Sequence, residues 1–340
     1  MHTILIEDYG AFLGKKGDRF IVRKAGKVVG EFPASQVERI VISSSGASVS
    51  SSALYLAVTK RITVMFTYSS GAPFAFLTPT QGHGSVHIRR AQYREAGSER
   101  GLTLAKAFVC GKLQNQRCLL NVWAKSRTRT NPELSDRLFQ LATDIDLILE
   151  EIGTVSGPLD TAGRELLMNA EGRAASSYWE GVAGLLPPEL GFPGRHGRGA
   201  SDPFNMMLNY GYGILYSQVW SAINTAGLDP FAGFLHTDRP GRVSLALDLI
   251  EEFRQQVVDR VLVHSLTGKE LKIETDVQPD MLSKSTREAV ASRVVNRLSE
   301  RVQVRESKVE LRNVIVRQAW SIARFLCGES ARYEPFYLRW

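Results

Sequence analysis

The sequence changes its periodicity at residues 103–123, which read TLAKAFVCGKLQNQRCLLNVW. Apolar residues recur there every three or four positions, and this is the spacing of one face of an α-helix. The pattern continues beyond this stretch, interrupted by Gly157-Pro158 and by a Pro- and Gly-rich loop at 187–203. We therefore expect a helix over the quoted stretch and further helices over 132–152, 161–179, 203–227, 244–262, 285–302 and 309–326.

The residues before this stretch have the pattern of β-strands. Short runs of β-branched and aromatic residues are separated by turn sequences such as Ser69-Ser70-Gly71. We expect a short helix at 52–60 and strands at 3–6, 20–23, 27–29, 38–42, 63–67 and 74–78. The sequence thus predicts an α+β protein, with a small N-terminal β domain at 1–85, a linker at 86–102 and a larger all-α domain at 103–340.

The composition is that of an ordinary globular protein. Of the 340 residues, 44% are hydrophobic and 23% are charged, which excludes a largely disordered chain. The three cysteines form no Cys-x-x-Cys pair, so we expect neither a disulfide framework nor a thiolate zinc site. The N-terminus has acidic residues where a signal peptide is basic, and no apolar run reaches the roughly 18 residues of a membrane helix. We expect a cytoplasmic protein that does not engage a membrane.

The positive charge is concentrated in one segment. Residues 86–130 contain ten Lys and Arg against Glu95 and Glu99, which gives +8. Because the whole chain has a net charge of +7, the remainder sums to −1. Such a concentration is typical of proteins that bind nucleic-acid phosphates. A solvated basic helix face, which would only keep the protein soluble, has the same composition.

One glutamate in the helical half occupies an apolar position. Glu171 is expected on the same helix face as Leu167 and Tyr178. A carboxylate that faces a core must be paired, protonated or bound to a metal, because burying it bare costs several kcal/mol, of the order of 5. A salt bridge to Arg164 or Arg173 is the simpler explanation, and a metal is the alternative.

A second group of acids crowds a single helical turn. Asp248 lies three and four residues before Glu251 and Glu252, and like charges at these spacings repel. The dipole of a nearby helix N-terminus would offset part of the repulsion, and a bound divalent cation would offset more. His236 ends an apolar run and is either a hydrogen-bonded core residue or a ligand. Together these oxygen and nitrogen donors suit Mn²⁺ or Mg²⁺ better than zinc.

Several motifs in one order extend this pattern. They are EGRAASSYW at 171–179, DPFN at 202–205, LNYGYG at 208–213, GFLHT at 233–237, SL at 244–245 and DLIEEFR at 248–254. In order and context they resemble the CRISPR-associated integrase-endonuclease family, the universal first Cas protein of spacer acquisition. The resemblance covers nearly the whole chain and includes the layout of a β domain followed by a helical domain.

The resemblance implies a metal-dependent DNA integrase and endonuclease. Glu171, His236 and Glu251 would be its metal ligands and catalytic residues, with Asp248 as a possible second acid and Mn²⁺ or Mg²⁺ as cofactor. In integration, a DNA 3′-hydroxyl attacks a phosphodiester at the border of a repeat array; cleavage of DNA or of branched intermediates uses the same site. The implied partners are DNA, a second copy bound through the β domain, and a small second Cas protein that bridges two such dimers.

Contacts to DNA are expected from the basic segment and from the loop at 187–203. Individual candidates for contacts to phosphate or DNA are Tyr178, Arg239, Arg242, Ser244, Arg254, Arg89, Arg90 and Lys106. Three other functions fit parts of the pattern: a DNA-binding scaffold without catalysis, a recombinase that attacks with Tyr178 or Tyr210, and a metal phosphohydrolase for small molecules. The charge of the segment 86–130 argues against the last, because a nucleotide needs far fewer cations.

Overall fold

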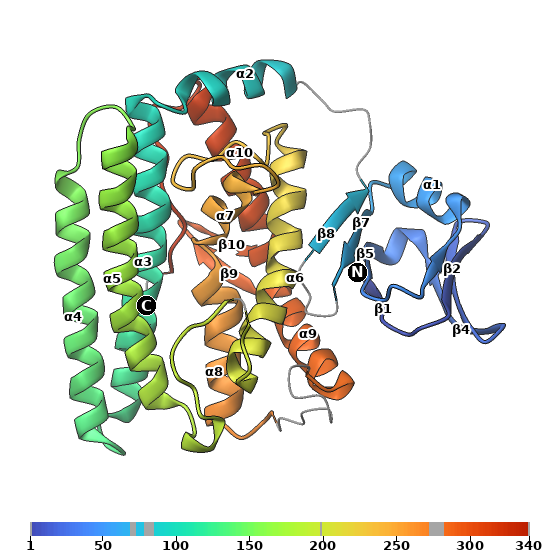
Figure 1. Ribbon diagram of the computed structural model, residues 1–340, viewed down its shortest axis with the longest axis horizontal. Coiled ribbons are helices and arrows are strands. Elements are labelled where there is room, and N and C mark those ends of the chain that lie inside the picture. Colours follow the sequence, from blue (N-terminus) through green and yellow to red (C-terminus); the bar gives the residue numbers. More distant parts are fainter. Residues whose placement is uncertain (1, 69–72, 78–84, 198, 272–281, 339–340) are drawn as a thin grey trace. The chain divides into compact units, whose positions relative to one another are not determined.

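The computed structural model of the protein describes residues 2–68, 73–77, 85–197, 199–271 and 282–338 (Figure 1). The chain divides into two compact units, Met1–Gly82 and His83–Trp340. The first is built mainly of strands and the second mainly of helices, so the expected α+β class is confirmed. No helix among the described residues is both long and apolar enough to cross a membrane.

The N-terminal unit contains two four-stranded sheets. One has the order β1 (His2–Ile6), β5 (Val37–Ile42), β7 (Thr63–Thr67), β8 (Pro73–Leu77). The other has the order β4 (Lys27–Pro33), β3 (Arg19–Lys24), β2 (Ala11–Lys16), β6 (Ser48–Val49). Strands β1, β5 and β7 pair in parallel, and β8 is antiparallel to β7. A core of Ile, Leu, Val and Ala side chains fills this unit.

The local predictions for this unit are largely confirmed. Every expected strand overlaps an observed one, and helix α1 (Ser51–Thr59) begins where Ser50 accepts a hydrogen bond from the backbone N–H of Ala53. Strands β2 and β6 were not expected, because β2 contains a glycine and two lysines and β6 has only two residues. The turn at 69–71 and the end of the strand expected at 74–78 lie outside the described residues.

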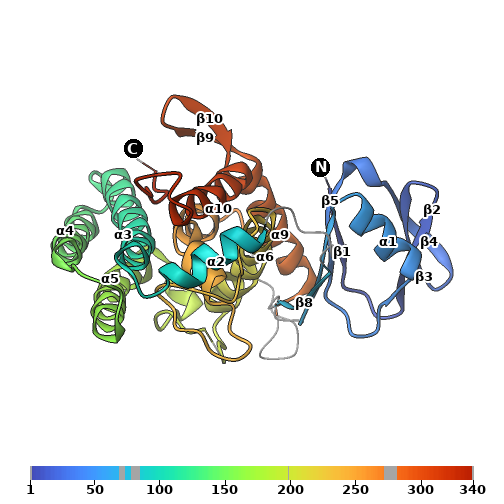
Figure 2. The ribbon, with the colours of Figure 1, turned by 90° about the horizontal axis from the view of Figure 1, so that it is seen from above.

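The C-terminal unit is a bundle of helices with one small hairpin (Figures 1 and 2). Its helices are α2 (Ser85–Glu95), α3 (Glu99–Arg127), α4 (Pro132–Thr154), α5 (Thr161–Leu185), α6 (Pro203–Thr225), α7 (Ser244–Ile250), α8 (Arg260–Thr267), α9 (Lys284–Ser299) and α10 (Leu311–Leu326). Both views show α3, α4 and α5 side by side. Each of these three helices packs against the other two, and α3 and α5 supply Lys112 and Glu171.

The expectation of a linker at 86–102 is wrong, because these residues form α2 and the beginning of α3. The hydroxyl of Ser98 caps α3 by accepting hydrogen bonds from the N–H groups of Arg100 and Gly101. The amide of Gln92 on α2 is buried and binds backbone groups of the loop at 229–232. The segment is rich in arginine and poor in apolar residues, which conceals the helix in the sequence.

Three of the expected helices also differ from the observed ones. The helix expected at 244–262 is interrupted: α7 ends at Ile250, a turn follows, and a wide helical turn of the π type at Gln255–Asp259 leads into α8. The helices expected at 285–302 and 309–326 are shortened by an antiparallel hairpin of β9 (Arg301–Val304) and β10 (Ser307–Glu310). At Glu300 the backbone is already extended, which ends α9.

Candidate active site

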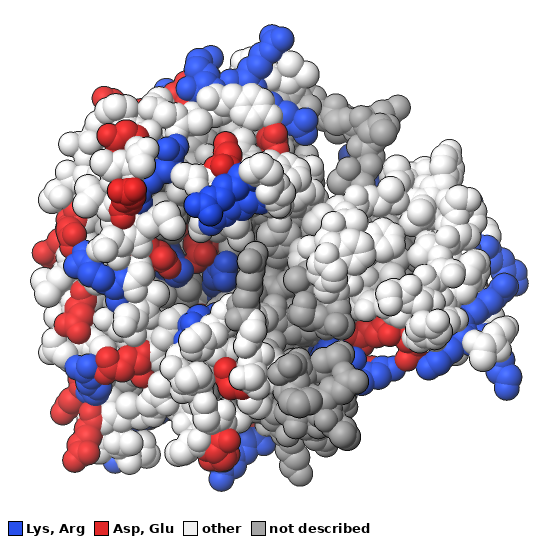
Figure 3. Space-filling model, in the orientation of Figure 1, with Lys and Arg blue, Asp and Glu red and all other residues white. Residues whose placement is uncertain are grey.

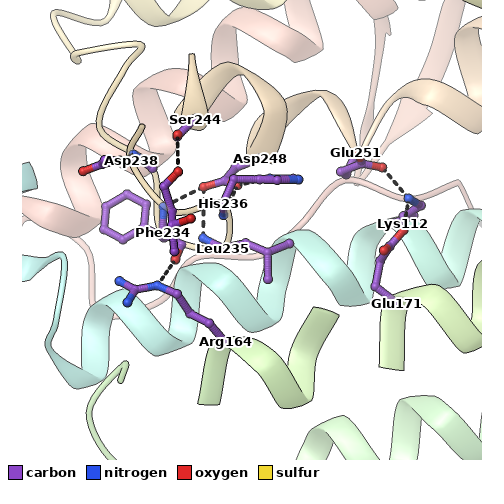
Figure 4. Close-up of polar contacts among 12 residues, drawn as sticks. Lys112, Arg164, Glu171, Phe234, Leu235, His236, Asp238, Ser244, Asp248 and Glu251 are labelled. Carbon is purple, nitrogen blue, oxygen red and sulfur yellow. Dashed lines mark hydrogen bonds and ion pairs between the residues drawn. The ribbon is translucent and has the colours of Figure 1, made fainter. Parts of the chain in front are cut away.

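Two carboxylates from distant parts of the chain meet at one ammonium group. Glu171 projects from the middle of α5, and Glu251 follows the last residue of α7. Between them lies Lys112 of α3, whose Nζ contacts Glu171 Oε1 and is 2.8 Å from Glu251 Oε2 (Figure 4). The two acids that the sequence singled out are therefore neighbours in space, and a cation already lies between them.

The ion pair predicted for Glu171 exists, but its partner is not an arginine. Arg164 donates hydrogen bonds to the backbone carbonyls of Phe234 and Ala96, and Arg173 pairs with Glu151. The partner is Lys112, which is 59 positions away from Glu171 in the sequence. Local sequence spacing could not reveal it, because the contact depends on the packing of α3 against α5.

Cations on both sides keep Glu251 ionised. Its side chain is only 8% exposed, and burial alone would raise its pKa. Arg254, whose Nε is 3.1 Å from Glu251 Oε1, and Lys112 outweigh this effect and lower the pKa of Glu251 to about 2. Burial likewise opposes the charge of Lys112, but Glu251 and Glu171 raise its pKa. Glu251 and Lys112 are therefore both charged at neutral pH.

His236 is held by a buried aspartate. Its Nδ1 is 2.7 Å from Asp248 Oδ1, and Asp248 also accepts hydrogen bonds from the backbone N–H groups of Phe234, Leu235 and His236 (Figure 4). A carboxylate only accepts, so we assign the imidazole proton to Nδ1 and a lone pair to Nε2. Metal-binding histidines are typically oriented by a carboxylate in this way.

This arrangement corrects the expectation for Asp248. Both of its oxygens accept hydrogen bonds from residues 234–236, so it orients His236 and is not a second acid beside Glu251. Figure 4 shows the imidazole between Asp248 and the group formed by Lys112, Glu171 and Glu251. His236 also contributes to the lowered pKa of Glu251, after Arg254 and Lys112.

Whether the site can hold a divalent metal depends on the kinds of donor atom present and on how close together they lie. Among the residues described, no three His, Cys, Asp or Glu side chains are close enough together to coordinate one ion in the present arrangement. The position between the two glutamates is taken by the ammonium of Lys112. Mn²⁺ and Mg²⁺ sites nevertheless use donors of these kinds: two neighbouring carboxylates and an imidazole whose Nε2 is available. The kinds of donor therefore fit such an ion, and its binding would require Lys112 to move aside and the two carboxylates and the imidazole to close around the ion.

The tyrosine expected to contact DNA lies in the core instead. Tyr178 is completely buried and donates a hydrogen bond to Asp259, which also accepts one from Tyr212. Burial, reinforced by the charge of Asp259, raises the pKa of Tyr178 well above its usual value. Tyr210 is buried as well. Neither Tyr178 nor Tyr210 is placed to contact DNA or to attack a phosphate.

Two further candidates for phosphate contact have structural roles. Lys106 donates to the carbonyls of Gly153 and Val155, and thereby caps the C-terminal end of α4. Ser244 is completely buried and donates to the carbonyl of Thr237. The expectation for Ser244 is wrong, because its side chain is buried and its hydroxyl donates within the protein. Lys106 is half-buried and has a third N–H, so its contact to phosphate stays a prediction.

The remaining candidates are more accessible. Arg89 and Arg90 on α2 and Arg239 are exposed, and Arg242 is half-buried. Figure 3 shows Lys and Arg side chains along the edge of the C-terminal unit where Figure 1 places α2. Arg254 is different, because it lies 4.6 Å from the ring centre of Tyr212 and pairs with Glu251. Whether these arginines bind DNA remains a prediction.

A cleft of about 620 Å³ opens beside Glu171. It begins at Lys112 and Glu171 and follows α5 to the loop after it; its other lining residues are Gly172, Ala175, Ser176, Trp179, Glu180, Ala183, Phe192, Pro193, Gly194 and Arg195. Arg195 is fixed by Asn205 and Asn209 and lies over Tyr212. Lys112, Trp179 and Arg195 were not among the individual residues expected at the site.

One signal for the cleft was available in the sequence. Gly172 is in the interior of α5, where glycine costs roughly 1 kcal/mol relative to alanine. A Cβ atom added at Gly172 would meet no atom within 4 Å, so protein packing does not require the glycine. The glycine beside Glu171 keeps space open on the side of the cleft.

Comparison with known proteins places the fold among characterised ones. A family model described as CRISPR associated protein Cas1 matches residues 4–296. A CRISPR-associated endonuclease Cas1 of Archaeoglobus fulgidus is 35% identical over 346 residues, covering 99% of both chains. Another, from Francisella tularensis subsp. novicida, is 30% identical over 341 residues and covers 100% of both.

Solved structures have the same fold at low sequence identity. A casposase bound to integration product superimposes with a TM-score of 0.84 at 22% identity, covering 98% of this chain and 93% of that one. A Cas1 protein from Thermotoga maritima gives a TM-score of 0.79 at 19% identity, covering 99% and 100%. A chain of a Cas6-RT-Cas1–Cas2 complex also gives 0.79 at 19% identity, with 98% of this chain and 36% of that one covered.

Proposed function

The chain belongs to the CRISPR-associated Cas1 family, and on this premise we propose that Glu171, His236 and Glu251 bind its catalytic Mn²⁺ or Mg²⁺. The family acts in CRISPR adaptation as DNA endonuclease and integrase, so the reaction is transesterification or hydrolysis at a DNA phosphodiester. The observation that carries the proposal is the position of Glu171 and Glu251 on one cation. It is supported by His236, which Asp248 orients with Nε2 as the available nitrogen.

The bound metal would polarise the scissile phosphate and lower the pKa of the attacking DNA 3′-hydroxyl or water. The protein's own residues prepare the site for this work. Asp248 holds the proton on Nδ1 of His236 and fixes the loop that carries it. Lys112 and Arg254 place positive charge beside the carboxylates, which favours the approach of an anionic phosphodiester. No covalent enzyme intermediate is needed, because positioning and charge stabilisation carry the reaction.

DNA would reach the site along the cleft and the exposed arginines. The cleft leads directly from Glu171 along α5, and Arg89, Arg90 and Arg239 offer positive charge to phosphates. Contacts to the backbone rather than to bases predict little sequence preference and a strong dependence of affinity on salt.

The proposal includes a homodimer formed through the N-terminal unit, and a small second Cas protein that bridges two dimers. A single site joins one DNA end, whereas a fragment has two ends, so at least two copies are required. On this unit Phe74 and Tyr68 are 57% and 60% exposed with ring centres 4.9 Å apart, an apolar surface that favours association. Sedimentation of the wild type and of Phe74→Glu tests the dimer: a monomeric wild type would contradict it. The cytoplasmic location also remains a prediction.

Strand transfer is the direct test of the proposed function. A labelled DNA duplex is incubated with a repeat-bearing plasmid and the wild-type protein, with Mn²⁺ or with EDTA. We expect joined products only with the metal, and none from His236→Ala. Isothermal titration with Mn²⁺ separates the enzyme from a DNA-binding scaffold: a scaffold would bind DNA but would have no metal site that His236→Ala removes.

A further inference from the structure

Glu251 lies on an irregular part of the helical chain. The N–H groups of Glu251, Glu252 and Phe253 bond to carbonyls three residues back, at 3.3, 3.3 and 2.9 Å, and the wide turn at Gln255–Asp259 follows. Breaks of this kind free backbone carbonyls and must be held by side chains. The direction of the Glu251 side chain therefore depends on what fixes this turn.

The first group that fixes it is Asn115 of α3, which is completely buried. Its Nδ2 donates to the carbonyl of Glu252 at 2.9 Å and to that of Phe336 at 3.1 Å. Its Oδ1 accepts from Gln256 Nε2 at 3.0 Å and from the N–H of Leu338 at 3.2 Å. One amide thus uses its full hydrogen-bonding capacity to join the turn to the C-terminal residues.

The second group is the carboxylate of Glu252, which is also completely buried. Oε1 accepts from the hydroxyl of Tyr333 at 2.6 Å. Oε2 accepts from the N–H of Phe336 at 2.7 Å and from Gln318 Nε2 at 2.9 Å. The rings of Phe253 and Phe336 stack with centres 5.0 Å apart. Glu252 therefore binds the C-terminal residues, whereas its neighbour Glu251 binds Lys112.

We propose that residues 333–338, which we name the C-terminal strap, act through Asn115 and Glu252 as positioning residues for Glu251. The inference rests on the proposed function, in which Glu251 is a metal ligand. The strap crosses the turn on the side of Glu252 and prevents the turn from rotating or relaxing into a regular helix. Glu251 is then kept beside Glu171 and His236, where the metal would bind.

The chemistry of the network favours a positioning role over one of stability alone. Burying an amide and a carboxylate is costly, and apolar side chains of similar volume would stabilise a fold at least as well. Every polar side-chain atom of Asn115 and Glu252 instead has a hydrogen-bond partner, and such groups specify one arrangement, because any shift leaves one of them buried and unpaired. Here the arrangement that is specified is that of the turn that carries Glu251.

The test measures Mn²⁺ affinity of the full-length protein by isothermal titration. Asn115→Leu removes all the hydrogen bonds of this side chain, and we expect at least a tenfold weaker affinity. Tyr333→Phe removes one hydroxyl and is a milder change, with about a threefold loss expected. If Asn115→Leu does not fold, the Mn²⁺ affinity of Tyr333→Phe provides the test. DNA affinity measured without metal should be unchanged in both variants, while the turnover of strand transfer falls.

Two controls separate positioning from general destabilisation. Val290→Ala opens a cavity at a buried position of α9, which is part of neither the turn nor the strap, and should lower the thermal midpoint without changing Mn²⁺ affinity. Arg305→Gln removes only the exposed ion pair to Glu334, on the solvent side of the strap, and should also leave Mn²⁺ affinity unchanged. The strap proposal is overturned if Asn115→Leu and Tyr333→Phe bind Mn²⁺ as the wild type does, or if Val290→Ala weakens binding equally. A wild type that binds no Mn²⁺ overturns the proposed function itself, and the strap proposal with it.

Discussion

Glu171 and Glu251 face each other across the ammonium group of Lys112, although they are carried by different helices. The ammonium neutralises part of the charge that two carboxylates bring together, and it occupies the position in which a divalent ion would have to bind. A metal must therefore compete with a group of the protein itself. This relationship leads to the first prediction.

Lys112→Met should strengthen Mn²⁺ binding. Without the ammonium the two carboxylates repel each other and the ion meets no internal competitor, so we expect an affinity about five- to tenfold higher, equivalent to roughly 1 kcal/mol. The same variant should be less stable in EDTA and regain stability when Mn²⁺ is added. Isothermal titration and thermal unfolding measure both effects. Lys125→Met, at an exposed position of α3, is the control; weaker Mn²⁺ binding by Lys112→Met would refute the competition.

Glu171→Ala should abolish strand transfer and leave DNA binding largely intact. In the proposed site Glu171 is a metal ligand, and it lies at one end of the cleft, so its loss leaves the cationic surfaces in place. We expect turnover to fall at least about a hundredfold, since the metal loses a charged ligand. Gel-based strand transfer and DNA binding by fluorescence anisotropy measure the two properties. Equal loss of both in a folded variant would contradict this division of roles.

Asp248→Asn should weaken the metal site through His236. An amide does not reproduce the carboxylate that holds the imidazole proton on Nδ1, so the two tautomers of His236 become mixed. Changes of this kind typically cost about 10- to 100-fold in metal affinity. Nitrogen chemical shifts of the His236 ring report the tautomer directly, and titration with Mn²⁺ reports the affinity. A single, unchanged tautomer in the variant would show that Asp248 does not set it.

Stability should fall as the pH rises from 5 to 8, because of Glu252. Burial raises the pKa of Glu252 to about 7 against partly opposing hydrogen bonds, above its usual value of 4.5. Between these values the folded protein holds a proton that the unfolded chain has lost, so the free energy of unfolding decreases by about 3 kcal/mol across the window. Glu251, with its pKa of about 2, stays ionised throughout. Urea unfolding of Glu252→Gln should show a flatter profile; parallel profiles for both proteins would exclude Glu252 as the cause.

Gly172→Ala should make the protein more stable and a weaker DNA binder. Alanine in a helix interior is favoured by roughly 1 kcal/mol, and its methyl group meets no protein atom. The same methyl group narrows the cleft beside Glu171. Gly153→Ala is a matched control, because this glycine of α4 also has open space around it but does not line the cleft. Urea unfolding and DNA titration give the two quantities, and equal DNA affinity in both variants would refute a role for the space at Gly172.

Most of the helices and most of the N-terminal strands could be recognised without coordinates, because their signals are local. The side chain of Asp202 accepts a hydrogen bond from the N–H of Asn205, three residues on, and Pro203 opens the helix as its sequence predicts. Glu171 was found in the same way, as a charge at an apolar position. Its neighbours Leu167 and Ala174 are indeed buried.

The partners of these side chains could not be found in that way. Lys106 and Lys112 are six residues apart in one basic segment, yet one caps α4 and the other joins two acids of the site. Asp248 and Glu251 belong to one acidic motif, yet the first orients a histidine and the second faces a cation. Periodicity and capping depend on residues within about four positions, whereas these contacts depend on how helices far apart in the chain pack together.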